Sequence, residues 1–84
     1  MIKSIVPNST TKQGVDFLYF PRLRDLREDS DMTQAQIAKL LFTSQTVYSR
    51  YERGAITIPV EHLIILADFY KVSTDYILGR TDKK

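Results

Sequence analysis

From Pro21 onward, apolar residues recur at intervals of three and four along the chain, which is the spacing that one face of an α-helix requires. Proline suits the first turn of a helix, and Leu23 and Leu26 after it are spaced to face a core. Four further helical stretches follow with short connections, and no pair of strands is needed to account for the pattern. The sequence therefore predicts an all-α domain of five helices.

Residues with capping character mark where these helices begin and end. A serine or threonine at the start accepts a hydrogen bond from the first turn, and a glutamine three residues after a threonine completes a capping box. Proline can open a helix, and a glycine or aspartate at the end can adopt the left-handed conformation that closes many helices. The predicted boundary residues are Asp31, Thr33 with Gln36, Ser44, Gly54, Pro59, Ser73 and Gly79.

The fourth predicted helix runs to about Tyr70 and has an inward and an outer side. Ile65 and Phe69, one turn apart, are predicted to form an apolar spot on the outer side, which either the aromatic segment 17–20 or a second copy of the chain would cover. His62 is the only histidine, and no cysteine or second histidine could share a metal with it. It is predicted to face solvent from the fourth helix. The residues predicted to face inward are Val60, Leu63, Ile64, Leu66, Ala67 and Tyr70.

The third predicted helix, about residues 44–53, has two faces of different chemistry. At about 100° per residue, Val47, Tyr48 and Tyr51 fall together and are predicted to pack on the core rather than to stack on bases. A solvated helix surface usually carries Glu and Lys pairs, whereas Gln and Arg pair with adenine and guanine edges in the major groove. The opposite face therefore predicts DNA readout, because it carries Gln45, Thr46, Ser49, Arg50 and Arg53 and no acid.

The distribution of charge agrees with a polyanionic partner. The whole chain has a net charge of only +2. Residues 33–54, however, carry Lys39, Arg50 and Arg53 against Glu52 alone, and residues 55–79 carry more acidic than basic side chains. A molecule that is positive at one end suits binding a polyanion in one orientation.

Length and composition restrict the other possibilities. A chain of 84 residues is one domain at most, with no room for a large substrate cavity beside a core. It contains no cysteine, which excludes disulfides and thiolate metal sites and suits a reducing compartment. The longest apolar run, residues 63–67, is too short to span a bilayer. We expect a cytoplasmic protein that is not an enzyme and needs no cofactor or metal, since no catalytic constellation or Gly-rich phosphate loop is visible.

Residues 33–54 read TQAQIAKLLFTSQTVYSRYERG, and this stretch closely resembles the helix-turn-helix of the Cro/repressor (XRE) family of bacterial and phage transcriptional regulators. The segments LRDLRED before it and HLIILADFYKVSTDYILG after it look like the first, fourth and fifth helices of that family. The resemblance implies a compact, lambda-repressor-like DNA-binding domain over residues 20–80, with the motif at 33–52 and a C-terminal tail at 81–84. It also implies a small regulator, in the commoner case a repressor, that binds a palindromic double-stranded operator as a homodimer.

The resemblance, together with the position of each residue on its helix, implies individual roles in DNA binding. The residues expected to contact bases are Gln45, Thr46, Arg50 and, through its methyl groups at the edge of the face, Val47. Those expected to contact the DNA backbone, which fixes position but carries no sequence information, are Gln34, Ser44, Ser49, Lys39 and Arg53.

Three further positions have a structural interpretation. Arg27 and Glu52 match positions that form a partly buried ion pair between the first and third helices, although Arg27 as a phosphate ligand is the alternative. Phe42 stands where the family usually has glycine, so either it adopts a positive φ or the turn has a different shape.

Residues 1–19 look separate from the rest of the chain. The run PNSTTKQG, residues 7–14, is polar and turn-rich, so we expect an arm or linker that is partly mobile. Phe17, Tyr19 and Phe20 are expected to cover the open end of the first helix. This arm also supports an alternative function, an antitoxin-like or other interaction module that binds a protein partner through residues 1–19.

Overall fold

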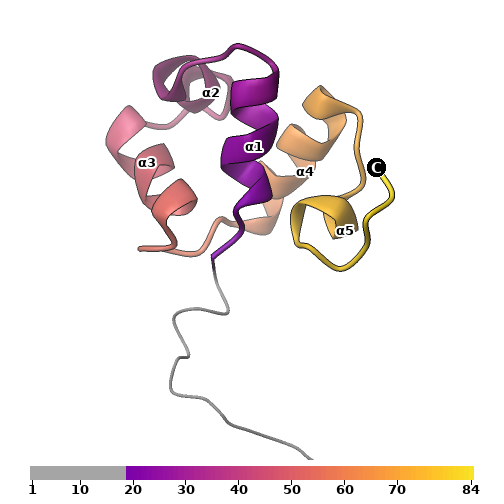
Figure 1. The fold of residues 1–84 in the computed structure, drawn as a ribbon. Coiled ribbons are helices and arrows are strands. Elements are labelled where there is room, and N and C mark those ends of the chain that lie inside the picture. Colours follow the sequence, from indigo (N-terminus) through magenta and orange to yellow (C-terminus); the bar gives the residue numbers. More distant parts are fainter. Residues whose placement is uncertain (1–18) are drawn as a thin grey trace, which may run out of the picture.

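The computed structural model describes residues 19–84. Five α-helices follow one another along this part of the chain: α1 (Arg22–Asp29), α2 (Gln34–Leu40), α3 (Gln45–Arg53), α4 (Val60–Tyr70) and α5 (Thr74–Ile77) (Figure 1). No strand occurs in the described residues, so the all-α prediction is confirmed. Residues 1–18, which make up nearly all of the predicted arm, lie outside the described part.

The helices begin at the predicted capping residues. The Thr33 hydroxyl accepts a hydrogen bond from the Gln36 N–H at 3.1 Å, and the Gln36 side chain accepts one from the Thr33 N–H at 2.8 Å. Ser44 and Ser73 each accept a hydrogen bond from the amide three residues further on. These contacts satisfy backbone donors that the first turn of a helix leaves without a partner.

All five helices of the described region end in the same motif, in which a left-handed residue follows the last turn. At the end of α2, the Phe42 N–H bonds to the Lys39 carbonyl at 3.1 Å and the Thr43 N–H bonds to the Ala38 carbonyl at 2.9 Å. The corresponding pair of bonds closes the other four helices. The left-handed residues are Asp31, Phe42, Gly54, Lys71 and Gly79, with φ of 56°, 56°, 75°, 60° and 79°.

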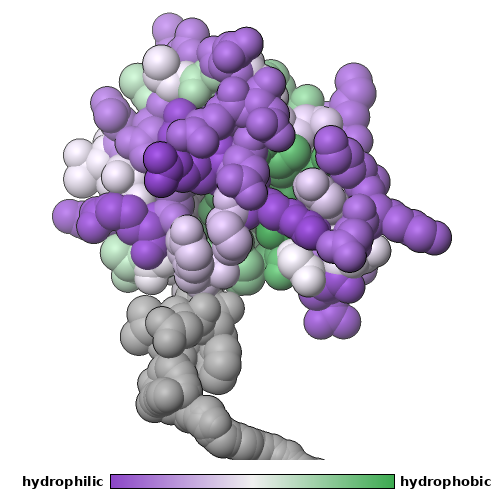
Figure 2. Space-filling view, in the orientation of Figure 1, coloured by the Kyte–Doolittle hydropathy of each residue, from purple (hydrophilic) through white to green (hydrophobic). Residues whose placement is uncertain are grey.

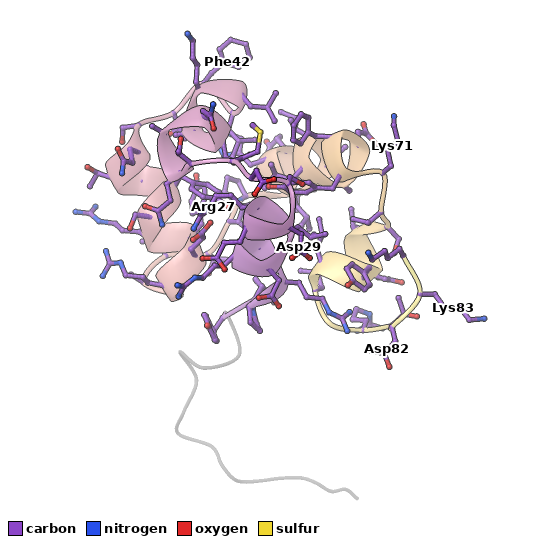
Figure 3. All side chains as sticks on the ribbon, turned by 45° about the horizontal axis from the view of Figure 1, so that its top comes forward. Arg27, Asp29, Phe42, Lys71, Asp82 and Lys83 are labelled. Carbon is purple, nitrogen blue, oxygen red and sulfur yellow. The ribbon has the colours of Figure 1, made fainter. Side chains whose placement is uncertain are left out.

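Phe42 therefore resolves the two alternatives for the turn between α2 and α3. It adopts the positive φ that a glycine would adopt, and the shape of the turn is retained. Its side chain is 94% exposed and projects away from the body of the molecule (Figure 3). The left-handed conformation of Lys71 at the end of α4 was not predicted, because lysine gives no signal for it.

The core lies where the five helices meet, with α1 between α3 and α5 (Figure 1). α2 packs on α3, and α5 contacts both α1 and α4. The outer surface is mostly hydrophilic, and in this view apolar atoms are visible chiefly over α4 beside α1 (Figure 2). None of the helices in residues 19–84 is both long and apolar enough to cross a membrane. The buried apolar residues are Leu23, Leu26, Ile37, Ala38, Leu41, Tyr48, Tyr51, Ile58, Leu63, Leu66, Ala67 and Ile77.

The inward face of α4 differs from the prediction at three positions. Val60 and Ile64 were predicted to be buried, but their exposed fractions are 66% and 48%. Ile65 was predicted to lie on the outer side, but it is half-buried and packs against the core. Because α4 is apolar around most of its circumference, the spacing of apolar residues does not define one inward face. Phe69 is exposed, as predicted.

His62 is also not where the prediction placed it. It is half-buried, and its Nδ1 lies 3.1 Å from the Tyr51 hydroxyl, within hydrogen-bond distance. The two rings meet edge to face, with centroids 5.8 Å apart. The prediction that His62 faces solvent is therefore wrong, because α4 brings it against a tyrosine of α3. Burial raises the pKa of the Tyr51 hydroxyl above its ordinary value.

The two ends of the described chain are held against the helices. Tyr19 lies against Gly54, where an added Cβ would be 3.2 Å from the tyrosine Cβ, while Phe20 packs against the core. At the other end, Arg22 bonds to the Tyr76 carbonyl at 2.8 Å and to the Asp82 carboxylate at 2.7 Å, with its guanidinium 4.0 Å from the Tyr76 ring centroid. Residues 81–84, predicted as a tail, are thus connected to α1 and α5.

Candidate nucleic-acid interface

One face of α3 is anchored in the core by two tyrosines. Tyr48 is completely buried and Tyr51 is 5% exposed. Their rings meet nearly perpendicularly, with centroids 6.1 Å apart, an arrangement that aromatic pairs favour. The tyrosines therefore pack as predicted and are not available to stack on bases.

Next to Tyr51 in the chain, Glu52 forms an ion pair that connects α3 to α1. Arg27 Nε donates to Glu52 Oε2 at 2.6 Å, and its second guanidinium nitrogen donates to Oε1 at 3.1 Å (the position of Arg27 is seen in Figure 3). Arg27 also donates to the Met32 carbonyl at 2.9 Å, so it ties the end of α1 as well. The Gln34 side chain completes the group by donating to Glu52 at 3.1 Å. The ion pair predicted from the family pattern is thus present, with Gln34 as a third member.

Burial and hydrogen bonding act in opposite directions on Glu52. Its side chain is only 3% exposed, and burial alone would raise its pKa. The hydrogen bonds from Arg27 and Gln34 outweigh burial and hold the pKa of Glu52 below its ordinary value. Glu52 is therefore ionised and neutralised by Arg27, so the one acid on α3 adds no free negative charge to its surface.

The opposite face of α3 is open to solvent. Gln45, Thr46, Arg50 and Arg53 are exposed, and Ser49 is half-buried between them and the body. Arg50 and Arg53 form no ion pair with any residue of the 19–84 segment. The face combines amide and hydroxyl groups with two cations, a set that suits base edges and phosphates.

A shallow groove runs along this face. It has a volume of about 370 Å³ and is lined by Gln34, Gln45, Thr46, Ser49 and Arg53. The start of α2 and the first half of α3 therefore converge on one surface. Helix starts favour anions because their backbone N–H groups point outward, which suits DNA phosphates at this edge.

Three of the predicted contact residues also have structural contacts. Ser44 Oγ accepts the capping bond from Val47, but its own O–H remains a donor. Gln34 gives one amide proton to Glu52 and has a second. Val47 is half-buried and packs against the core, so only part of its side chain lies on the open side. Lys39 on α2 is exposed to solvent.

Two residues near this surface were not predicted as DNA contacts: Tyr19 was expected only to cover the open end of the first helix, and Arg24 was not singled out from the sequence. Tyr19 and Arg24 line a second depression together with Ser49 and Arg53. For Arg24 a signal existed, since it lies three residues before Arg27 and thus on the same side of α1. No group of three His, Cys, Asp or Glu side chains within residues 19–84 is placed to hold a metal ion.

Known proteins resemble this chain over the same region. The profile of the family described as helix-turn-helix matches residues 23–77. The chain is 42% identical over 65 residues to an uncharacterized HTH-type transcriptional regulator, YobD, of Bacillus subtilis, covering 77% of this chain and 58% of that protein. It is 37% identical over 59 residues to the cryptic phage CTXphi transcriptional repressor RstR of Vibrio cholerae, covering 70% and 53%. With the HTH-type transcriptional regulator ImmR of Bacillus subtilis it shares 34% over 61 residues, covering 73% and 48%.

These matches have a defined extent. The chain spans about half the length of the curated relatives it matches. No solved structure matches it at a significant level. The matched region contains all of α1 to α5 except the first residue of α1, and so includes the groove and the buried ion pair.

Proposed function

This chain belongs to the helix-turn-helix family of the Cro/repressor (XRE) type, and we propose that it is a sequence-specific double-stranded DNA-binding regulator. α3 enters the major groove, and its open face reads base edges there. The observation that carries the proposal is the open face of α3, which holds Gln45, Thr46 and Arg50 on a helix fixed to the core by Tyr48 and Glu52.

Each of the three residues Gln45, Thr46 and Arg50 contacts a different base. Gln45 can pair with N6 and N7 of an adenine, and Arg50 with O6 and N7 of a guanine. Thr46 and the exposed part of Val47 lie beside them, where methyl groups can meet a thymine methyl. This division is supported by exposure: Gln45, Thr46 and Arg50 are open to solvent without a protein partner in the described region.

Phosphate contacts fix the position of the protein on the duplex. Gln34 and Ser44 stand at the first turns of α2 and α3, Ser49 and Arg53 line the groove, and Lys39 lies exposed on α2. These side chains surround the base-reading group, as expected for contacts that orient a recognition helix.

The active form is a homodimer on a palindromic operator. A single α3 offers only three or four base-reading side chains, each worth roughly 1–3 kcal/mol of discrimination, so two copies double what one can distinguish. Two recognition helices about 34 Å apart read successive turns of the duplex. The exposed apolar side chains of Val60 and Ile64 support contact with a second copy.

Regulation takes place by occupancy of the operator. Repression needs only that a bound protein excludes other proteins from the same DNA, and one relative is named as a transcriptional repressor. No catalytic step is required.

The direct test is binding of the wild-type protein to duplexes selected from a random pool, followed by sedimentation of the complex. We expect one enriched palindromic site that holds two copies of the chain. Retention of all duplexes alike would contradict sequence-specific binding, and one copy on a non-palindromic site would contradict the homodimer.

A further inference from the structure

A cleft separates α1 from α3 beside the groove described above. Its volume is about 700 Å³, within the range of roughly 300–1,000 Å³ that ligand sites occupy. The residues that line it are Tyr19, Arg24, Arg27, Gln34, Ser49, Glu52, Arg53 and Gly54. The family-derived contacts account for part of this lining, but for neither Tyr19 nor Arg24.

The cleft carries uncompensated positive charge. At its floor, Arg27 and Glu52 neutralise each other through two hydrogen bonds. On one wall, Arg24 pairs with Glu28 at 3.0 Å and with no other acid of residues 19–84, and both side chains are more than half exposed. An exposed pair of this kind contributes little energy, so Arg24 can exchange its partner for a stronger one. On the other wall, Arg53 has no ion-pair partner among residues 19–84.

The cleft is continuous with the groove along α3. Gln34, Ser49 and Arg53 line both depressions. A polyanionic strand bound beside Gln45 and Thr46 can therefore extend along the same surface as far as Arg24.

We propose that this cleft binds a phosphate group of the DNA backbone just outside the base pairs that α3 reads, with Arg24 on one wall and Arg53 on the other as its ligands. The inference rests on the proposed DNA-binding function and adds to it a contact from α1, outside the helix-turn-helix motif. On binding, the Arg24 guanidinium leaves Glu28, to which it donates one exposed hydrogen bond, and donates to the phosphate, which can accept two parallel hydrogen bonds from one guanidinium.

Arg24→Gln tests the proposal, with Arg80→Gln as the matched control. Arg80 also forms an exposed pair, with Asp75 at 3.6 Å, but it follows α5 in the chain, and α5 lies on the other side of α1 from α3 (Figure 1). Each phosphate contact adds about 0.9 to the slope of log affinity against log salt. At about 0.1 M salt, Arg24→Gln is therefore expected to bind a selected duplex about eightfold more weakly, with a slope smaller by about 0.9. Base preference stays the same, and Arg24→Lys retains most of the affinity.

A gain of affinity provides the second measurement. Glu28→Gln removes the acid that competes for Arg24, so we expect tighter binding than for wild type, whereas Asp75→Asn leaves binding unchanged. If Arg24→Gln matches Arg80→Gln in affinity and salt slope while wild type binds its site, this inference alone is wrong. If wild type selects no duplex, the proposed function fails first. Saturable binding of inorganic phosphate to the free protein, followed by the Gly54 amide resonance and lost in Arg24→Gln without loss of duplex affinity, would assign the cleft to a free anion and overturn the proposal.

Discussion

The two faces of α3 differ in almost every property although they share one helix of nine residues. The inner face is buried and has nearly all its polar groups paired: Tyr48, Tyr51 and Glu52 pack against other helices and Glu52 is held by Arg27. The outer face is open, and its Gln45 and Arg50 have no protein partner in the described region. The inner face fixes where the helix lies, and the outer face is left free for a ligand.

This difference means that stability and DNA recognition should respond to different substitutions. Changes on the inner face should lower the free energy of unfolding and leave the base preference of the folded protein intact. Changes on the outer face should alter base preference and leave the free energy of unfolding nearly unchanged. The predictions below separate the two.

Tyr48→Ala should have the largest effect on stability. Truncating a fully buried aromatic residue costs about 3–5 kcal/mol, through lost burial and the cavity that remains. Tyr48→Phe is the matched control: the hydroxyl is buried beside Glu52, but no hydrogen bond to it has suitable geometry. We expect the control to stay within about 1 kcal/mol of wild type. Urea unfolding of both variants makes the comparison, and equal losses would place the stabilisation in the hydroxyl instead of the ring.

Reversing the charges of the Arg27–Glu52 pair should come next. Arg27→Glu or Glu52→Arg alone leaves two like charges in a buried place and should cost about 3 kcal/mol or more. The double reversal restores an attractive pair and should retain more stability than either single variant. Thermal unfolding of the three proteins measures this, and a double variant that loses the sum of both single losses would rule out the pairing as a source of stability.

Acid should weaken the same contact. Because the pKa of Glu52 is lowered in the folded protein, the unfolded chain takes up its proton first as the pH falls below about 4.5. The stabilisation is fully present above that pH and is lost as the pH falls through the lowered pKa of folded Glu52. Unfolding free energies measured through this interval should therefore fall more steeply for wild type than for Glu52→Gln. Parallel curves would mean that Glu52 does not link stability to pH.

Phe42→Gly should have the smallest effect on stability. Phe42 lies in the turn before α3 and belongs to neither face of that helix. A left-handed non-glycine residue costs about 1–2 kcal/mol, which glycine avoids. Glycine also raises the entropy of the unfolded chain, and this offsets part of the gain in stability. We expect a gain of up to about 1 kcal/mol in unfolding free energy with unchanged base preference. Lys71→Gly, at the corresponding position after α4, should behave similarly. A loss of stability in Phe42→Gly would show that the exposed phenyl ring contributes contacts of its own.

The sequence predicted the helices well because their signals are local. Capping boxes, serine caps and glycine ends depend on residues three or four positions apart, and these boundaries are confirmed at Thr33, Ser44 and Gly54. The faces of α3 were also readable, since its apolar residues occupy one side only.

What the sequence could not predict depends on contacts between distant residues. The partners of Arg22 lie more than fifty positions away, and no local pattern points to them. The Tyr51–His62 contact depends on how α4 rotates against α3, and α4 is too uniformly apolar to show its inward side. For the same reason Val60 and Ile64 were assigned to the wrong side. The cleft beside Arg24 could be found only once α1 and α3 were placed together.

The central claim is that the outer face of α3 reads base sequence, and site selection with Arg50→Ala beside wild type tests it most directly. Both proteins would be incubated with random duplex DNA, and the preference at each position of the recovered sites compared. We predict that Arg50→Ala keeps the melting temperature of wild type but loses roughly 1–3 kcal/mol of discrimination at particular base pairs, one in each half of the site. Identical preferences at every position would contradict the account.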